Sequence, residues 1–445
     1  MVRTRDMNVL FGVLHRTSVN ICSLRRPVLT VTCHMAGRCS TRRWVSKDSS
    51  VLKHLLFKIK STGPISVAEY MREVLSNPFK GYYVHQDMIG EDGDFMTSPE
   101  ISQIFGELLA VWCISEWMAA GRPKTLQLVE LGPGRGTLAE DILRVFKQFQ
   151  PLLNDCDISL HMVEISHKLS DIQALKLTGE NLPSDHNKIS YKKGTTRTGL
   201  PISWYQVLAD VPRGFSLYLA HEFFDALAIH IFRKTERGWA EVLIAEDPSV
   251  SNMLCFVLSP TATLAAKTLI HAEETRDHVE VCPDAAVIVQ ELASRIDADG
   301  GAALIADYGH DGDKTDTFRG FRDHKLHDVL IDPGSADLTA DVDFSYLRRM
   351  LQGKVASLGP ISQQEFLTNM GIDIRLQALL VNSKDSATKK ELLSGYDMLV
   401  NPHKMGERFK FFALLPEERL FPSVKQAKTD KSKPAPLPVA GFSKL

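Results

Sequence analysis

The sequence predicts a doubly wound α/β fold, in which a mostly parallel sheet carries helices on both faces. Two observations carry this prediction. From residue 125 onward, short apolar segments alternate with segments of helical apolar spacing. The first apolar segment, residues 126–131, runs directly into a glycine-rich turn, as the first strand of many doubly wound sheets does.

A helical lead-in precedes the predicted sheet. Residues 51–59 and 66–75 both have helical apolar spacing, and the second segment ends before Asn77-Pro78. Residues 81–99 are rich in glycine, aspartate and aromatic residues, so we expect a loop there. Ser98-Pro99-Glu100 then has the residue types that begin helices, and it predicts an amphipathic helix over 100–119.

The alternation gives the expected order of the remaining elements. Strands are expected at 126–131, 158–163, 215–220, 302–306, 354–358 and 408–415, and helices at 138–149, 166–177 and 363–369. Between 229 and 258 the pattern changes to two hairpin-like strands, turned by Arg237-Gly238 and Asp247-Pro248. We interpret this part as an insertion over about residues 229–285.

The sequence therefore divides into four parts. Residues 1–46 form a leading segment, 47–120 a helical region with a loop, 121–415 the α/β domain with its insertion, and 416–445 a tail. The tail is rich in lysine and proline and is expected to be flexible.

Charge is distributed unevenly between these parts. The leading 46 residues hold eight arginines against one acid, Asp6, and have no continuous apolar stretch, which is typical of a mitochondrial transit peptide. The remaining chain has 44 basic and 53 acidic residues, a net charge of −9 that would repel a phosphate backbone. We therefore expect no nucleic-acid substrate.

The apolar runs and the cysteines exclude further classes. No apolar run approaches the roughly 20 residues that cross a bilayer, so no membrane span is expected. The cysteines beyond the leading segment are Cys113, Cys156, Cys255 and Cys282, and their wide spacing forms no metal-ligand pair. Neither a metal site nor a disulfide framework is predicted.

The sharpest motif is the turn after the first predicted strand, Glu130-Leu131-Gly132-Pro133-Gly134-Arg135-Gly136. Glycines at Gly132, Gly134 and Gly136 allow a ligand to approach the backbone. Dinucleotide sites usually space their glycines G-x-G-x-x-G, whereas this turn has G-x-G-x-G led by an acid, which favours S-adenosylmethionine over NAD. Glu130 can hold the cationic amino-acid end of that cofactor.

A second acid, Glu164, follows the next predicted strand. It lies about 30 residues past the glycine turn, where doubly wound folds accept ribose hydroxyls. The two motifs together predict a cofactor site.

A third motif, His221-Glu222-Phe223-Phe224-Asp225, follows the strand predicted at 215–220. Because ligand crevices lie at the carboxyl ends of parallel strands, Glu222 and Asp225 should face the reacting centre. Two carboxylates beside aromatic rings suit a cationic acceptor such as a guanidinium. Alternatively, either acid caps a helix and the phenylalanines belong to the core. His221 is a candidate proton acceptor, although methyl transfer from a sulfonium depends mainly on alignment.

With these motifs, the sequence resembles the MidA-like methyltransferase family, including its mitochondrial members. The resemblance covers nearly the whole chain beyond the leading segment and is carried by GDFMTSPEISQIFGE at 93–107, VELGPGRGTL at 129–138, EFFDAL at 222–227, DYG at 307–309 and DLTADVDF at 337–344. It implies a seven-stranded, Rossmann-like class I methyltransferase fold.

The resemblance also implies an activity. This is the symmetric dimethylation of an arginine on the 49 kDa-type subunit of mitochondrial NADH:ubiquinone oxidoreductase, complex I, in support of complex assembly in the mitochondrial matrix. S-adenosyl-L-methionine would be bound by Glu130, Gly132, Gly134, Gly136 and Glu164. The segment from Glu222 to Asp225 would lie at the acceptor, and the loop at 93–102 would close over it.

Two positions depart from the family pattern. The family often has asparagine where this chain has His221, and proline where it has Ala228, so the departures lie in the acceptor segment and the cofactor motif is intact. Two other functions remain open from the sequence. One is a methyltransferase-fold assembly chaperone that binds a complex I subunit without catalysis. The other is a nicotinamide-dependent dehydrogenase, against which the glycine spacing argues.

Overall fold

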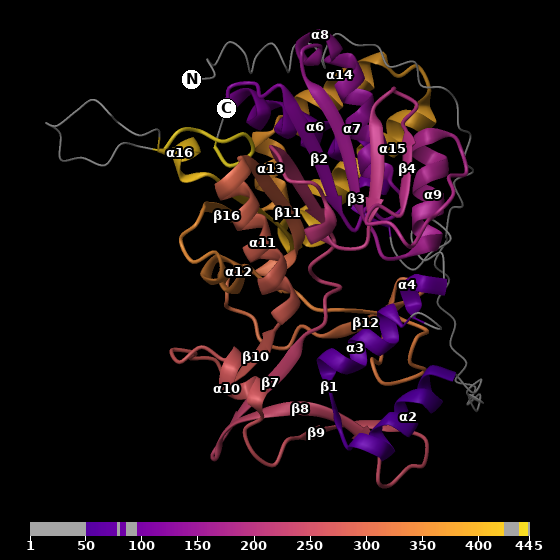
Figure 1. The fold of residues 1–445 in the computed structure, drawn as a ribbon, viewed down its shortest axis with the longest axis vertical. Coiled ribbons are helices and arrows are strands. Elements are labelled where there is room, and N and C mark those ends of the chain that lie inside the picture. The colour runs from indigo at the N-terminus through magenta and orange to yellow at the C-terminus, as the bar shows by residue number, and fades with distance from the viewer. Residues whose placement is uncertain (1–49, 78–80, 86–95, 422–435, 444–445) are drawn as a thin grey trace, which may run out of the picture.

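The computed structural model describes residues 50–77, 81–85, 96–421 and 436–443. The predicted transit peptide at 1–46 and much of the predicted active-site loop lie outside the described residues. In Figure 1 the described chain forms a large α/β domain above a smaller lobe built around a second sheet.

The central sheet of the large domain has the strand order β16-β17-β11-β6-β2-β3-β5-β4. The five inner strands from β11 to β5 run parallel, whereas β17, β16 and β4 are antiparallel to their neighbours. Their bounds are β2 Thr125–Leu131, β3 Asp157–Val163, β4 Lys192–Thr195, β5 Pro201–Tyr205, β6 Ser216–His221, β11 Gly301–His310, β16 Ala356–Ser362 and β17 Phe409–Leu415.

This order confirms the doubly wound fold. From β2 the chain continues outward to β3 and β5 on one side, and then returns to β6 and β11 on the other side. The strand order therefore reverses between β2 and β6, and in such sheets the ligand crevice opens at that point, beyond the carboxyl ends of the strands. Both predicted motifs of the site follow these two strands directly.

Helices cover both faces of the sheet. Leu126 and Leu128 of β2 join the core under one face, and Val129 and Leu131 join the core under the other, as the alternation of side chains along a strand requires. The helices of this domain are α5 Ser98–Ile101, α6 Gln103–Ala119, α7 Thr137–Gln148, α8 Gln150–Leu153, α9 His167–Thr178, α11 Pro283–Asp299, α12 Phe344–Met350, α13 Gln363–Asn369, α14 Ile372–Asn382, α15 Ser386–Val400 and α16 Glu417–Leu420, with short helical turns at Leu208–Asp210 and Pro402–Gly406.

The helix predicted over 100–119 is interrupted at Ser102. This residue has an extended backbone (φ −157°, ψ 129°), and its hydroxyl accepts a hydrogen bond from the backbone N–H of Ile104. Ser102 thus caps α6, and residues 98–101 form the separate short helix α5. The strands β4 and β5 were not predicted, because four- and five-residue segments containing Gly194 and Pro201 show too little periodicity.

The smaller lobe contains more strands than predicted. Besides the two strands at β7 His230–Thr235 and β8 Gly238–Glu246, its sheet includes β9 Leu254–Leu258, β10 His278–Val281 and β1 Ile65–Ser66. A three-stranded sheet of β12 Arg319–Arg322, β13 Lys325–His327 and β14 Asp337–Thr339 lies beside it, with the helices α2 Ser50–Thr62, α3 Val67–Ser76, α4 Tyr82–His85 and α10 Leu264–Leu269. A short strand, β15 Val342–Asp343, pairs with the end of β11.

The predicted lead-in divides between the two parts of the molecule. Strand β1 pairs with β8, and α2 and α3 bury their apolar faces in the core of the smaller lobe, whereas α6 lies in the core of the large domain. The N-terminal segment therefore adds the strand β1 to the inserted sheet, and its helices α2 and α3 pack in the core that this sheet forms.

The end of the chain also differs from the predicted flexible tail. Val439 is buried, and the side-chain amide of Asn369 on α13 donates a hydrogen bond to the carbonyl of Gly441 at 3.0 Å. The ring of Phe442 meets that of Phe366 edge-on, with centroids 5.6 Å apart. Residues 436–443 are thus packed, while the lysine- and proline-rich stretch at 422–435 lies outside the described residues. None of the helices described is long and apolar enough to span a membrane.

Candidate active site

The glycine turn begins where β2 ends. Gly132, Gly134 and Gly136 all have positive φ values, of 62°, 52° and 77°, which favour glycine. Gly136 also occupies the cap position of α7. A Cβ atom at Gly132 would stand 2.8 Å from the Phe223 ring. The turn therefore presents bare backbone at the strand-order reversal and touches the segment that follows β6.

Glu130 lies one residue before the end of β2 and is only 4 % exposed. Its Oε2 atom has no hydrogen-bond partner among the described residues. Burial, together with the nearby charge of Glu164, raises its pKa to about 8. A buried carboxylate in this state is stabilised by a cationic ligand, so the residue suits the ammonium group of a cofactor.

Glu164 follows β3 and is oriented by two donors. Its Oε1 atom accepts a hydrogen bond from the backbone N–H of Ser166 at 2.7 Å, and its Oε2 atom accepts one from Gln173 Nε2 at 3.1 Å. Burial raises its pKa to about 7, although these donors oppose the shift. The carboxylate retains lone pairs for hydroxyl donors such as those of a ribose.

Gln173 on α9 joins the two cofactor motifs, and the sequence analysis did not single it out. Its amide nitrogen donates to the carbonyl of Gly134 at 2.7 Å as well as to Glu164, and its amide oxygen accepts from Trp204 Nε1 at 2.8 Å. The residue is fully buried. Its i, i+4 spacing with Leu169 and Leu177 places it on the buried face of the helix, and this spacing was the available signal.

The segment after β6 turns sharply at Glu222, which has φ = 49° although it is not a glycine. The next three backbone N–H groups, of Phe223, Phe224 and Asp225, all donate to Asp307 Oδ2, at 3.1, 2.9 and 3.3 Å. Asp307 is fully buried. Its carboxylate points into the backbone of this segment. We call residues 222–225 the acceptor turn.

The two acids of the acceptor turn differ in their hydrogen bonds. Asp225 Oδ2 accepts from the hydroxyl of Thr339 at 2.8 Å, and its carbonyl accepts from the backbone N–H of Ala340 at 3.1 Å. Glu222 Oε1 is buried without a hydrogen-bond partner among the described residues. Burial and the neighbouring Asp225 raise the pKa of Glu222 well above its usual range. Glu222 is thus the acid of this turn with an oxygen available to a donor.

Tyr83 touches both sides of the crevice. Its hydroxyl donates to Asp337 Oδ1 at 2.5 Å, close to the acceptor turn, and its carbonyl accepts from the hydroxyl of Ser166, next to Glu164. Burial and Asp337 raise the pKa of Tyr83. Sequence reasoning missed this residue because its partner lies 254 positions further along the chain.

His221 lies in an aromatic environment. Its ring stacks on Phe409, with centroids 6.0 Å apart and planes 10° apart, and meets Phe105 edge-on at 5.0 Å. Burial lowers its pKa to about 3, so the ring is neutral at physiological pH. Its Nε2 atom lies 3.4 Å from Glu222 Oε1. The structure brings all three predicted residues of this motif together at the end of β6.

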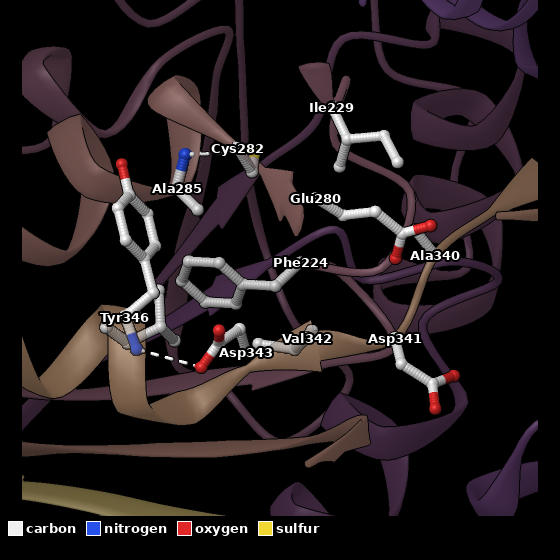
Figure 2. Close-up of a pocket in the computed structure, with 11 residues that line it drawn as sticks. Phe224, Ile229, Glu280, Cys282, Ala285, Ala340, Asp341, Val342, Asp343 and Tyr346 are labelled. Carbon is white, nitrogen blue, oxygen red and sulfur yellow. Dashed lines mark hydrogen bonds between the residues drawn. The ribbon is translucent and has the colours of Figure 1, made fainter. Parts of the chain in front are cut away.

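A cavity of about 30 Å³ lies behind the acceptor turn, and Figure 2 shows its lining. Its lining includes Phe224, Cys282 at the N-cap of α11, and Tyr346 of α12. This volume accommodates one water molecule but not a cofactor.

The charge of the crevice is strongly negative. Six buried or half-buried acids surround it: Glu130, Glu164, Glu222, Asp225, Asp307 and Asp337. Burial raises the pKa of Asp225, and Arg319, which is itself paired with Asp341 at 2.7 Å, opposes that rise. A sulfonium, an ammonium and a guanidinium are all cations, and each would relieve the repulsion between these acids.

A second group of acids, with a histidine, lies in the smaller lobe. His278, Glu280 and Asp316 bring potential ligand atoms within 4.8 Å of one another. The Glu280 carboxylate already accepts hydrogen bonds from Thr317 and from the backbone N–H of Phe318. These contacts give Glu280 a structural role in holding the 316–318 loop.

The strand order, the glycine turn and the buried acids at the ends of β2 and β3 define a class I methyltransferase that uses S-adenosyl-L-methionine. Residues 108–361 match the family described as "Putative S-adenosyl-L-methionine-dependent methyltransferase", and the chain belongs to this family.

Named relatives are similar over most of their length. The chain is 66% identical to "Protein arginine methyltransferase NDUFAF7, mitochondrial" of Homo sapiens, over 89% of this chain and 90% of the relative. It is 48% identical to the homologue of that protein in Drosophila melanogaster, over the same shares of the two chains.

A solved structure from Burkholderia thailandensis, described as a "likely methyl transferase", is bound to S-adenosyl-homocysteine. It is 25% identical to this chain and superposes with a TM-score of 0.66, over 82% of this chain and 91% of the other. The demethylated product of the cofactor is therefore bound by a protein of the same fold.

Proposed function

We propose that this chain is a protein arginine methyltransferase that transfers methyl groups from S-adenosyl-L-methionine to a guanidinium nitrogen. The observation that carries the proposal is the position of Glu222. This buried carboxylate has an oxygen without a hydrogen-bond partner among the described residues, and it lies beside a glycine turn that the next residue, Phe223, contacts. The relatives named as protein arginine methyltransferases support the same substrate class.

On the cofactor side, the chain supplies charge and backbone. Glu130 would hold the ammonium group, Glu164 the ribose hydroxyls, and Gly132, Gly134 and Gly136 the space that the sulfonium end requires. Two observations support the fit of these residues to the cofactor. The Oε2 atom of Glu130 has no hydrogen-bond partner among the described residues, and all three glycines have a left-handed backbone. The bound cofactor supplies an electrophilic methyl group.

On the acceptor side, Glu222 Oε1 would accept an N–H of the guanidinium and orient that nitrogen toward the methyl group. Transfer of the methyl group converts the sulfonium to a thioether and releases one proton from the guanidinium nitrogen. In its ionised form the Glu222 carboxylate can take up that proton, since a raised pKa makes it a stronger base than an exposed glutamate. Asp225 adds negative charge, but its Oδ2 atom already accepts a hydrogen bond from Thr339.

We assign His221 a positioning role in this scheme. A ring with a pKa of about 3 is a weak base, and its stacking on Phe409 fixes it as one wall beside Glu222.

We further propose the substrate and the compartment. The substrate is the 49 kDa-type subunit of mitochondrial complex I, the product is symmetric dimethylarginine, and the reaction supports complex assembly in the mitochondrial matrix. The arginine-rich segment at 1–46 supports import, and the relatives bear the name mitochondrial. The net negative charge of the remaining chain suits a basic segment of a protein substrate.

Mass spectrometry of the purified 49 kDa-type subunit, after incubation with the full chain and S-adenosyl-L-methionine, tests the proposal. Dimethylarginine should form with the parent protein, and fragment ions distinguish the symmetric from the asymmetric product. Glu222→Gln should slow transfer strongly but leave a measurable rate, while calorimetry still detects cofactor binding. Glu391→Gln, an exposed substitution on α15, is the matched control.

A subunit that binds the chain and never gains a methyl group would contradict the enzyme and favour the assembly chaperone. Methylation of another protein, with the same dependence on Glu222, would retain the activity and overturn the proposed substrate.

A further inference from the structure

The backbone at Glu222 has a conformation that residues with a side chain rarely adopt. Its φ of 49° lies in the left-handed region, where the Cβ atom crowds the backbone. Strained residues of this kind persist only where their surroundings hold them, and they cluster at functional sites. The residue with the unpartnered carboxylate oxygen is thus also the strained residue of the turn.

The surroundings that hold Glu222 come from β11. The N–H of Glu222 donates to the carbonyl of Ala306 at 3.1 Å, which continues the pairing of β6 with β11 by one residue. The following three N–H groups then converge on one oxygen, Asp307 Oδ2. Asp307 Oδ1 accepts the backbone N–H of its neighbour Tyr308 at 2.9 Å. Both oxygens of the carboxylate are thus engaged by backbone donors.

A carboxylate is a costly residue at this position. Asp307 is fully buried, and both Glu222 and Asp225 oppose its charge. If the side chain at position 307 only filled space, a neutral residue would do so without this charge repulsion. Three convergent N–H donors, however, need an acceptor with concentrated negative charge.

We propose that Asp307 is the positioning residue of the acceptor turn: it holds residues 223–225 so that Glu222 keeps its left-handed backbone and presents its carboxylate to the guanidinium. Asp307 touches no substrate atom and acts through Glu222. This inference rests on the proposed function for the identity of the acceptor, but the conformation it describes can be measured independently.

The test compares Asp307→Ala and Asp307→Asn in the full chain. Alanine removes the acceptor of all three N–H groups, whereas asparagine keeps one neutral oxygen and should restore part of the function. With the 49 kDa-type subunit as substrate, we expect kcat to fall about 100-fold in the alanine variant and about tenfold in the asparagine variant. The affinity for S-adenosyl-L-methionine, measured by calorimetry, should change less than about twofold in both.

A double-mutant cycle with Glu222→Gln separates positioning from general stability. If Asp307 acts through Glu222, Asp307→Asn should cause little further loss of kcat in the Glu222→Gln protein. Asp141→Asn on α7 is the matched control, because Asp141 is also buried and lies outside the acceptor turn. It should lower the melting temperature without a change in kcat.

Crystal structures of the parent and Asp307→Ala keep the inference testable even if the parent shows no transfer to this subunit. A Glu222 that leaves the left-handed region in the variant supports the inference, whereas unchanged residues 222–225 overturn it. Equal, additive losses of kcat in both backgrounds would also overturn it. Absence of methyl transfer by the parent, with the turn rearranged in the variant, would count against the proposed function alone.

Discussion

At the scale of single residues, the glycine turn offers a sharp test of the cofactor site. Gly132→Ala places a Cβ atom 2.8 Å from the Phe223 ring, in a backbone with φ = 62°. We expect the variant to lose at least tenfold in affinity for S-adenosyl-L-methionine, because either the ring or the turn must move. Isothermal titration calorimetry measures the loss.

Gly121→Ala provides the control for this substitution. Gly121 has φ = 86°, and no atom of the described residues lies within 4 Å of the place that a Cβ atom would occupy. Alanine there causes the same kind of backbone strain without a clash. In both variants the free energy of unfolding should fall by roughly 1 kcal/mol, so both should unfold at a lower temperature. Equal cofactor affinities in the two proteins would show that the contact with Phe223 is unimportant.

Glu130 predicts a pH dependence of cofactor binding. Its pKa of about 8 means that the carboxylate is largely protonated at pH 6, and only the ionised form attracts an ammonium group. Affinity for S-adenosyl-L-methionine should therefore rise from pH 6 to pH 8, by at most about tenfold per unit from this group. Glu164, with a pKa of about 7, acts in the same direction.

The Glu130→Gln protein isolates this contribution. It should bind the cofactor more weakly at pH 8 and show a flatter profile, retaining only the part due to Glu164. An affinity that falls between pH 6 and pH 8 in the parent would mean that Glu130 does not bind the cation in its ionised form.

At the scale of elements, Gln173 couples α9 to the glycine turn, and Trp204 of β5 fixes the orientation of its amide. Trp204→Phe removes the indole N–H donor, so the amide can rotate and its contacts with Gly134 and Glu164 weaken. We expect about a fivefold loss of cofactor affinity, equivalent to about 1 kcal/mol. Trp117→Phe, which loses an indole hydrogen bond to Pro123, should reduce stability and leave the affinity unchanged.

The sequence predicted the elements of the site better than their mutual contacts. Strand ends and glycine spacing were sufficient to place Glu130, Glu164 and Glu222 at one edge of the sheet, because these signals are local. The orientation of Asp307 could not be predicted, since the DYG motif shows only that an acid follows a strand. Which donors it meets depends on the turn after β6, 82 to 84 residues earlier in the chain.

At the scale of the whole molecule, the end of the chain closes over α13. Phe442→Ala should lower the free energy of unfolding by about 2–3 kcal/mol, since its ring packs against Phe366 and beside Gly359. Phe421→Ala is the matched control, because that ring is 39% exposed. Chemical denaturation measures both. Equal, small effects would support the flexible tail that the sequence predicted.

The division of the chain into lobes was the least predictable feature. Periodicity located α2 and α3 correctly but could not show that they cover a sheet formed by residues 230–281. The pairing of Ile65 with Ile244 spans 179 positions and has no local signal. The doubly wound order, in contrast, followed from the alternation of strands and helices, since chirality and short connections leave few other arrangements.

The helix α6 has a consequence for the biogenesis of the protein. It is apolar on all sides, and its two acids are buried: Glu107 pairs with Arg375, and Glu116 with Arg419. Both arginines are synthesised more than 260 residues after their partners. The two buried acids of α6 therefore gain these ion pairs only after residues 375 and 419 have been synthesised, so the last part of the chain completes the surroundings of a helix near its beginning.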